Sequence, residues 1–333
     1  MIVILSVVVL GVLAGFVPQI KFTYDLLSSF PANMPSREGF SIIEKQYPPG
    51  ELAPVQVMVD TQGKSIDLRD SLGRLPVTAQ VSEPVTGKVS PDFQSYSLML
   101  NMNPYTTEAM QAIPTIREAA SAALASSGAS DPDSRVWIAG QTAEQYDSQA
   151  MITQDTRIIL PIVIGMIALL LLLYLRSIVA TIYLVLTVVL SYLSALGLGW
   201  LVLHYMMGVD AIQGLIPLYA FVFLVALGED YNIFMISSIW KKCRTMPLKQ
   251  AIREGVGETG SVITSAGLIL AGTFMVLATL PIQVLVQFGM ITAIGVLLDT
   301  FVVRPFVVPA ITLLLGRLAF WPGKSHARSA EGQ

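Results

Sequence analysis

The chain has 333 residues, of which 53% are hydrophobic and 13% charged, and its formal net charge is −3. A soluble protein carries roughly 25% charged residues, so this composition is typical of a membrane protein. No basic patch with interleaved aromatic residues points to a nucleic-acid partner. The sequence has two histidines and one cysteine, and it contains no HExxH, P-loop or GxSxG motif. A metalloenzyme, an ATPase and a serine hydrolase are therefore poorly supported, and we expect neither enzymatic activity nor a metal or cofactor.

Six segments are long and apolar enough to cross a hydrocarbon core of about 30 Å, which needs roughly 20 helical residues. The first segment has no basic leader, so a transmembrane helix is favoured over a signal peptide. The last is too long for one straight crossing, and Pro305 and Pro309 are expected to kink it or to end one part of it. The segments are 2–18, 158–175, 178–203, 215–238, 261–281 and 285–316.

Basic residues gather at three places that lie on one side of the membrane when the six segments are threaded in order. These places are the turn at Arg176, the segment 239–260 and the tail 317–333. The short loops on the opposite side contain neither lysine nor arginine. The positive-inside rule therefore predicts a multi-pass protein of the cytoplasmic membrane with both termini in the cytoplasm and residues 21–156 outside.

Residues 21–156 contain more than half of the charged side chains and are predicted to form a compact α+β domain. Their order of helices and strands suggests a βαββαβ split fold preceded by a helix, with Thr106 or Thr107 as the cap of the alanine-rich helix. The predicted helices are 36–47 and 106–126, and the predicted strands are 54–60, 95–101 and 135–139, the last ending in Gly140.

The predicted fold class is a membrane all-α bundle of six transmembrane helices with one extracytoplasmic α+β domain between helices one and two. The domains are a transmembrane helix over 1–20, the outer domain over 21–156, a five-helix membrane domain over 157–316 and a cytoplasmic tail over 317–333.

Ionisable residues inside the apolar segments are the strongest functional indication. Asp230 lies near the middle of segment 215–238, where a carboxylate costs about 2.5–3.5 kcal/mol on insertion scales. Desolvation favours its neutral form, which suits a group that loads and releases a proton. Tyr231 and Asn232 add a hydroxyl and an amide, and Gly228 allows a neighbouring helix to approach closely. We favour a functional Asp230 over one that only bonds another helix.

Glu229 is less clear than Asp230. The two side chains are about 100° apart around a helix, so they cannot face the same partner equally. Glu229 is either a second proton site or a residue in a hydrated cavity.

Segment 285–316 contains only two charged residues, Asp299 and Arg304. Five positions leave them about 140° apart on an α-helix, so each is expected to find its partner on a different helix unless Pro305 distorts the turn. A fixed cation near several carboxylates can leave one exchangeable proton at neutral pH. A static buried ion pair is the alternative.

Segment 261–281 contributes hydroxyl groups and small residues. For Ser261, Thr264, Ser265 and Gly267, close packing and hydroxyl bonding to the helix backbone are favoured. A role in a proton wire is the second interpretation.

The motif Gly-Glu-Asp-Tyr at 228–231 resembles the Gly-x-Asp-Tyr of MMPL proteins, members of the resistance-nodulation-division superfamily. The resemblance is to their C-terminal half and covers essentially the whole chain. Further stretches that fit are 238–242, 251–255, 265–267 and 287–289, the last leading into Asp299 and Arg304.

This resemblance implies proton-coupled export of lipidic or other hydrophobic substrates, with a porter-like outer domain. Asp230 and Tyr231 match one of the family's two Asp-Tyr relay pairs, and Asp299 and Arg304 match its supporting charges. Glu229, Ser265 and Asn232 would support the relay. Glu229 departs from the family pattern, because its position is usually filled by a small or uncharged residue.

A full-length member of that family has two such halves, so three readings of the chain follow. The leading hypothesis is a half-size secondary transporter that exchanges protons, lies among membrane lipids and pairs with itself or with a separately encoded half. The second is a non-transporting accessory or scaffold subunit, or a truncated product, associated with a complete transporter. The third is a protein-export auxiliary whose outer domain grips polypeptide.

Overall fold

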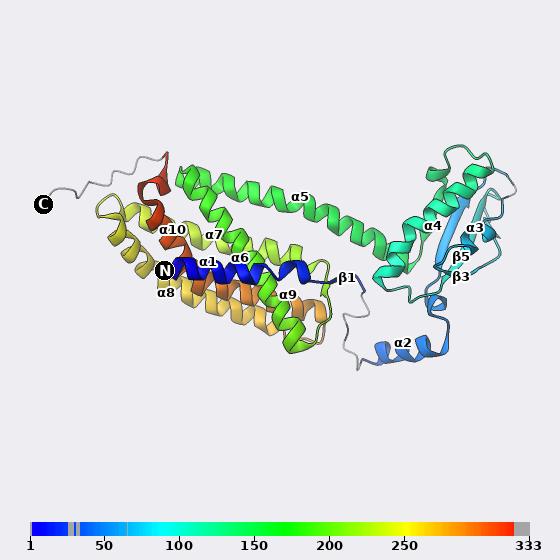
Figure 1. Cartoon of the computed structure of the whole chain (residues 1–333), viewed down its shortest axis with the longest axis horizontal. Helices are drawn as coiled ribbons and strands as arrows, with labels where there is room; N and C mark the ends of the chain where they lie inside the picture. Colours follow the sequence, from blue (N-terminus) through cyan, green and yellow to red (C-terminus); the bar gives the residue numbers. More distant parts are fainter. Residues whose placement is uncertain (1, 26–29, 31–33, 65, 323–333) are drawn as a thin grey trace. The chain divides into compact units, whose positions relative to one another are not determined.

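The computed structural model describes residues 2–25, 30, 34–64 and 66–322 (Figure 1). The chain divides into two compact units, each with its own core. We call Met1–Phe22 with Asp155–Gln333 the helical unit, and Thr23–Gln154 the sheet unit. Of the predicted cytoplasmic tail, 317–333, residues 323–333 lie outside the described residues.

Five helices of the described residues are long and apolar enough to cross a membrane by length and composition. The N-terminal segment forms the shorter apolar helix Val3–Gln19, so a sixth crossing stays a prediction. The five spans are Gln141–Leu175, Ile178–Met206, Ile216–Lys242, Leu248–Leu277 and Gln283–Leu315.

The sheet unit is inserted after η1, and from α5 onward the elements of the helical unit follow one another with short connections (Figure 1). They are α1 (Ile2–Ala14), η1 (Val17–Gln19), α5 (Gln141–Leu175, which begins in the sheet unit), α6 (Ile178–Leu201), η5 (Val202–Met206), β7 (Ile212–Gln213), α7 (Ile216–Lys242), α8 (Leu248–Leu277), α9 (Gln283–Leu298), η6 (Asp299–Val307), α10 (Val308–Leu315) and η7 (Gly316–Phe320).

Helix α1 packs closely against α6 because a glycine lies at their crossing. A Cβ atom on Gly197 would come within 1.9 Å of the Leu13 carbonyl oxygen. Close by, the hydroxyl of Ser194 donates a hydrogen bond of 2.8 Å to the carbonyl of Leu10. Small and hydroxyl residues at a crossing let two helix backbones approach closely. Among apolar helices in lipid, this close packing and hydrogen bonding drive association, because hydrophobic burial does not.

The basic segment 239–260, left between the predicted spans 215–238 and 261–281, is mostly helical, so both helices extend beyond their predicted ends. Helix α7 continues to Lys242 and α8 begins at Leu248. The ammonium of Lys242 bonds Glu258 at 2.7 Å and lies 3.5 Å from Glu254, which joins the two helices beyond their apolar parts. Loss of apolar character marks the end of the membrane-embedded portion of a helix and does not mark the end of the helix.

The last span is one continuous helical path from Gln283 to Leu315. Its middle, η6, is a π-helix that contains Pro305, and Pro309 lies at the start of α10. Neither proline ends the helix, because local π-helical adjustment accommodates a residue that cannot donate a backbone hydrogen bond.

The sheet unit contains an antiparallel sheet in the order β3-β5-β2-β6, with β4 also paired to β5. The order β2-α3-β3-β4-β5-α4-β6 contains the expected βαββαβ arrangement with β4 as an additional short strand, and the preceding helix is α2. The bounds in this unit are β1 (Phe22–Thr23, at the boundary), α2 (Pro35–Gln46), η3 (Pro49–Leu52), β2 (Val55–Asp60), α3 (Arg69–Gly73), β3 (Thr78–Val81), β4 (Val85–Thr86), β5 (Phe93–Leu100), α4 (Thr107–Ser126), η4 (Pro132–Arg135) and β6 (Val136–Ala139).

Local rules account for much of the sheet unit. Val55, Val57 and Val59 alternate along β2 and are fully buried in the same core as the apolar face of α4. Thr106 caps α4 as expected, with its hydroxyl oxygen accepting from the Ala109 amide at 3.3 Å. No residue range was predicted for the short elements α3, β3 and β4, because their few residues show no clear apolar periodicity.

Candidate functional site

The centre of the candidate site is an ion pair inside the helical unit. Arg304 donates to the carboxylate of Asp299, and the two residues are 4% and 7% exposed. They do not find their partners on different helices, because the exception foreseen for a turn distorted at Pro305 applies. An α-helix places residues i and i+5 about 140° apart, but both residues lie on η6, where the i to i+5 bonding of a π-helix brings such residues onto one face.

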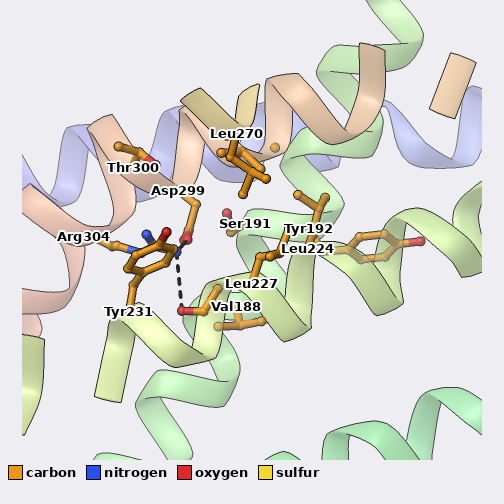
Figure 2. Close-up of a pocket in the computed structure, with 13 residues that line it drawn as sticks. Val188, Ser191, Tyr192, Leu224, Leu227, Tyr231, Leu270, Asp299, Thr300 and Arg304 are labelled. Atoms are coloured by element: carbon orange, nitrogen blue, oxygen red, sulfur yellow. Dashed lines mark hydrogen bonds and ion pairs between the residues drawn. The ribbon is translucent and has the colours of Figure 1, made fainter. Parts of the chain in front are cut away.

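Arg304 also joins η6 to α7. Its guanidinium lies 4.5 Å from the centroid of the Tyr231 ring, and its Nη2 is 3.4 Å from the Gly228 carbonyl oxygen. Figure 2 shows Asp299, Arg304 and the Tyr231 ring side by side at one end of a small cavity. The structure thus brings together three of the four residues that the sequence assigned to a proton relay.

The cavity beside this group has a volume of about 20 Å³, and its walls come from α6, α7, α8, α9 and η6. A site of this size holds about one water molecule if polar partners are present. Ser191, Tyr231, Asp299 and Thr300 supply such partners along the wall. Ser191 and Thr300 were not among the predicted site residues, because an isolated hydroxyl in an apolar helix carries no distinctive pattern.

A second, larger pocket of about 280 Å³ also has Arg304 in its wall. Residues of α8 and η6 line it together with Met235 of α7. Arg304 and Thr300 belong to the walls of both cavities. Among the described residues, Arg304 Nε and Thr300 Oγ1 have no hydrogen-bond partner. These two atoms can therefore form hydrogen bonds with a bound molecule or with water.

Close packing of α8 positions Thr300 beside Asp299. A Cβ atom on Gly267 would lie 2.3 Å from Thr300 Oγ1 and 2.7 Å from its Cγ2, so only glycine fits this crossing. Ser265 on the same helix is exposed, and its hydroxyl donates to the Ser261 carbonyl at 2.9 Å. This is the back-bonding that was favoured for Ser265.

The acidic pair on α7 divides between two faces. Asp230 is exposed and forms neither a hydrogen bond nor an ion pair with any residue that the structure describes. Glu229 and Asn232 are 5% and 0% exposed and lie inside the bundle. The separation of about 100° around the helix explains the division, and it makes Glu229 the interior carboxyl of this pair.

Apolar helices of membrane-spanning length that surround a buried ion pair and a polar cavity define a multi-pass membrane protein. The chain belongs to the MMPL family, whose sequence profile matches residues 30–332.

Three curated relatives illustrate the range of the family. The apo-petrobactin exporter of Bacillus anthracis is 58% identical over all of this chain and 45% of its own length. A putative membrane protein of Streptomyces coelicolor is 39% identical over 91% of this chain and 36% of its own length. The sulfolipid-1 exporter MmpL8 of Mycobacterium tuberculosis is 34% identical over 87% and 26%. The chain spans less than half the length of these relatives.

Proposed function

We propose that this chain forms one half of a secondary transporter that uses the proton gradient to export lipidic or otherwise hydrophobic substrates. The observation that carries the proposal is the buried ion pair of Asp299 and Arg304 on η6, with the half-buried ring of Tyr231 on α7 against it. Buried charges inside membrane helices are costly and mark ion pathways. Two relatives named as exporters, one of apo-petrobactin and one of sulfolipid-1, support a transport function.

In this mechanism Asp230 is the residue that gains and loses the transported proton. Tyr231 follows it directly on α7 and holds the guanidinium of Arg304 against its ring. The positive charge of Arg304 offsets the negative charge of Asp299. Protonation of a neighbouring carboxyl therefore changes the net charge around this pair. Protonation of Asp230 would then favour a different packing of α7 against η6 and move the helices that lead to the sheet unit.

The position of Asp230 favours a second half beside α7. A carboxylate near mid-span is stable only against protein or a water-filled cavity. Asp230 is exposed on the helical unit, so we propose that another copy of the chain or a separately encoded half covers it. In the same proposal the first 20 residues cross the membrane, residues 21–156 lie outside as a porter-like domain that accepts substrate, residues 157–316 form the membrane domain, and both termini lie in the cytoplasm.

The replacement Asp230→Asn tests this function because it keeps the size and polarity of the side chain and removes its proton chemistry. We expect export of a fluorescent hydrophobic probe, and the accompanying proton uptake, to fall to background. Membrane insertion and yield should be unchanged. The matched control is Asp210→Asn, which alters an exposed carboxylate in the loop before α7 and should leave export intact.

Full export by the Asp230→Asn protein would reject the proposal. It would favour the accessory reading, in which a complete transporter supplies the proton chemistry and this chain only associates with it.

A further inference from the structure

Glu229 and Asn232 form a buried polar cluster that the proposed relay does not use. Glu229 is 5% exposed and Asn232 is 0% exposed. Both carboxyl oxygens of Glu229 and both amide atoms of Asn232 have no hydrogen-bond partner among the described residues. Four buried polar atoms without partners on a single helix turn are unusual, because such atoms are nearly always satisfied in folded proteins.

The cost of this cluster depends on the protonation state of Glu229. Burying an ionised carboxylate without a partner costs far more than burying a neutral polar group, and a buried carboxyl commonly takes a proton instead. The protonated carboxyl has one O–H donor and one carbonyl acceptor. The interior of the helical unit therefore favours Glu229 as a carboxylic acid.

Asn232 is suited to serve both protonation states of Glu229. The two residues are three positions apart on α7, a spacing that makes side chains neighbours on a helix surface. The Asn232 carbonyl can accept from a protonated Glu229, and its amide N–H groups can donate to an ionised one.

The charges around Glu229 do not give it a permanent counter-ion. Asp299 and Arg304 on η6 exert opposite electrostatic effects on Glu229, and they pair with each other. Asp230 adds a negative charge from the same helix as Glu229. Helices α6 and α9 contain no charged residue.

The charged residues of α8 lie in its first turns, at 249–258. Glu254 and Glu258 there pair with Lys242 at the end of α7. Within the described residues, Glu229 has no ion pair of its own.

We propose that Glu229, with Asn232 as its hydrogen-bonding partner, is a second proton-binding site on the interior face of α7, separate from Asp230. The proposal rests on proton-driven export for its physiological meaning, and it deepens that function. The helix would carry one exchangeable proton on its interior face and one on its outer face. An exporter with both sites moves twice as many protons per substrate as one that uses Asp230 alone.

Carbodiimide labelling tests the site without any transport measurement. Dicyclohexylcarbodiimide enters membranes and reacts with protonated carboxyl groups in apolar surroundings, forming a stable adduct that mass spectrometry locates on a peptide. We expect Glu229 to be labelled in membranes that contain the full chain, and the labelling to decline as the pH is raised. The Glu229→Gln protein should lose this adduct, and the Asp230→Asn protein should retain it.

A second variant examines the partner. The replacement Asn232→Leu removes the amide that the proposal assigns to ionised Glu229, so labelling should persist to higher pH than in the unaltered protein. Absence of the Glu229 adduct at every pH, in both the unaltered and Asp230→Asn proteins, would overturn the second site. Unchanged pH dependence in the Asn232→Leu protein would overturn the role of Asn232.

Proton stoichiometry separates this inference from the proposed function. If Glu229→Gln retains export, the proton-to-substrate ratio should be halved, and an unchanged ratio would count against the second site. Full export by Asp230→Asn would reject the relay while leaving the labelling result at Glu229 to be judged by itself.

Discussion

The crossing of α8 and η6 allows one steric prediction to be worked out in detail. Replacing Gly267 by alanine would place a methyl group 2.3 Å from Thr300 Oγ1, 2.7 Å from its Cγ2 and 3.0 Å from its Cβ. Side chains do not tolerate these distances, so α8 or η6 must shift. Overpacking of this kind costs about 1–3 kcal/mol.

Gly272 on the same helix is a matched control. An alanine there meets no heavy atom within 4 Å. Both replacements share the gain of roughly 0.5–1 kcal/mol that follows from removing a glycine from a helix interior. The difference between the two variants therefore isolates the clash, and Gly267→Ala should be about 1–3 kcal/mol less stable than Gly272→Ala.

The assay is the free energy of unfolding of the purified chain, obtained by titrating mixed micelles with a denaturing detergent and following helix content. Thr300→Ala should recover part of the loss in the Gly267→Ala background, because it removes the two closest atoms. A Gly267→Ala protein as stable as the Gly272→Ala protein would refute the reasoning, since it would show that the helices do not meet at this point.

Three further predictions concern the ion pair and the sheet unit. Asp299→Asn and Arg304→Met should each lower the free energy of unfolding by about 3–5 kcal/mol in the same assay, because each leaves a buried polar partner behind. The double variant should lose less than the sum of the two single losses. Strictly additive losses would contradict the pairing. Gly140→Ala should destabilise the sheet unit by about 1–3 kcal/mol, since Gly140 has a φ of +108° and its Cβ would lie 2.9 Å from the carbonyl oxygen of Pro54, just before β2. Hydrogen exchange of the sheet amides should report this loss, while Gly39→Ala, which meets no atom within 4 Å, should leave exchange unchanged. Thr106→Ala should weaken the start of α4 by about 1 kcal/mol, measured as faster amide exchange in its first turn, whereas Thr106→Ser should retain protection.

Sequence reasoning succeeded where a structural rule acts over a few neighbouring residues. The capping of α4 by Thr106 needs only a hydroxyl at the start of a helical pattern. The burial of alternate valines in β2 follows from the two-residue period of a strand. The same local rules missed α3, β3 and β4, because two to five residues give too little pattern to separate a short element from a loop.

Helix ends were less predictable than the apolar portions they flank. Hydropathy located the apolar C-terminal half of α8 but placed the start of the helix near residue 261, whereas the helix begins at Leu248. Pairing of Lys242 with Glu254 and Glu258 stabilises polar helical turns that have no reason to be apolar. Composition alone reports the surroundings of a segment and leaves its backbone conformation open.

The sequence alone determined that this is a membrane protein with rare intramembrane charges at Asp230, Asp299 and Arg304, because the cost of desolvation makes long apolar runs and their exceptions easy to recognise. Only the tertiary structure decided how those charges are arranged. The π-helical backbone of η6 pairs Asp299 with Arg304, and the rotation of α7 buries Glu229 while it exposes Asp230. Both outcomes depend on how one helix packs and turns against its neighbours, which involves residues far apart in the chain.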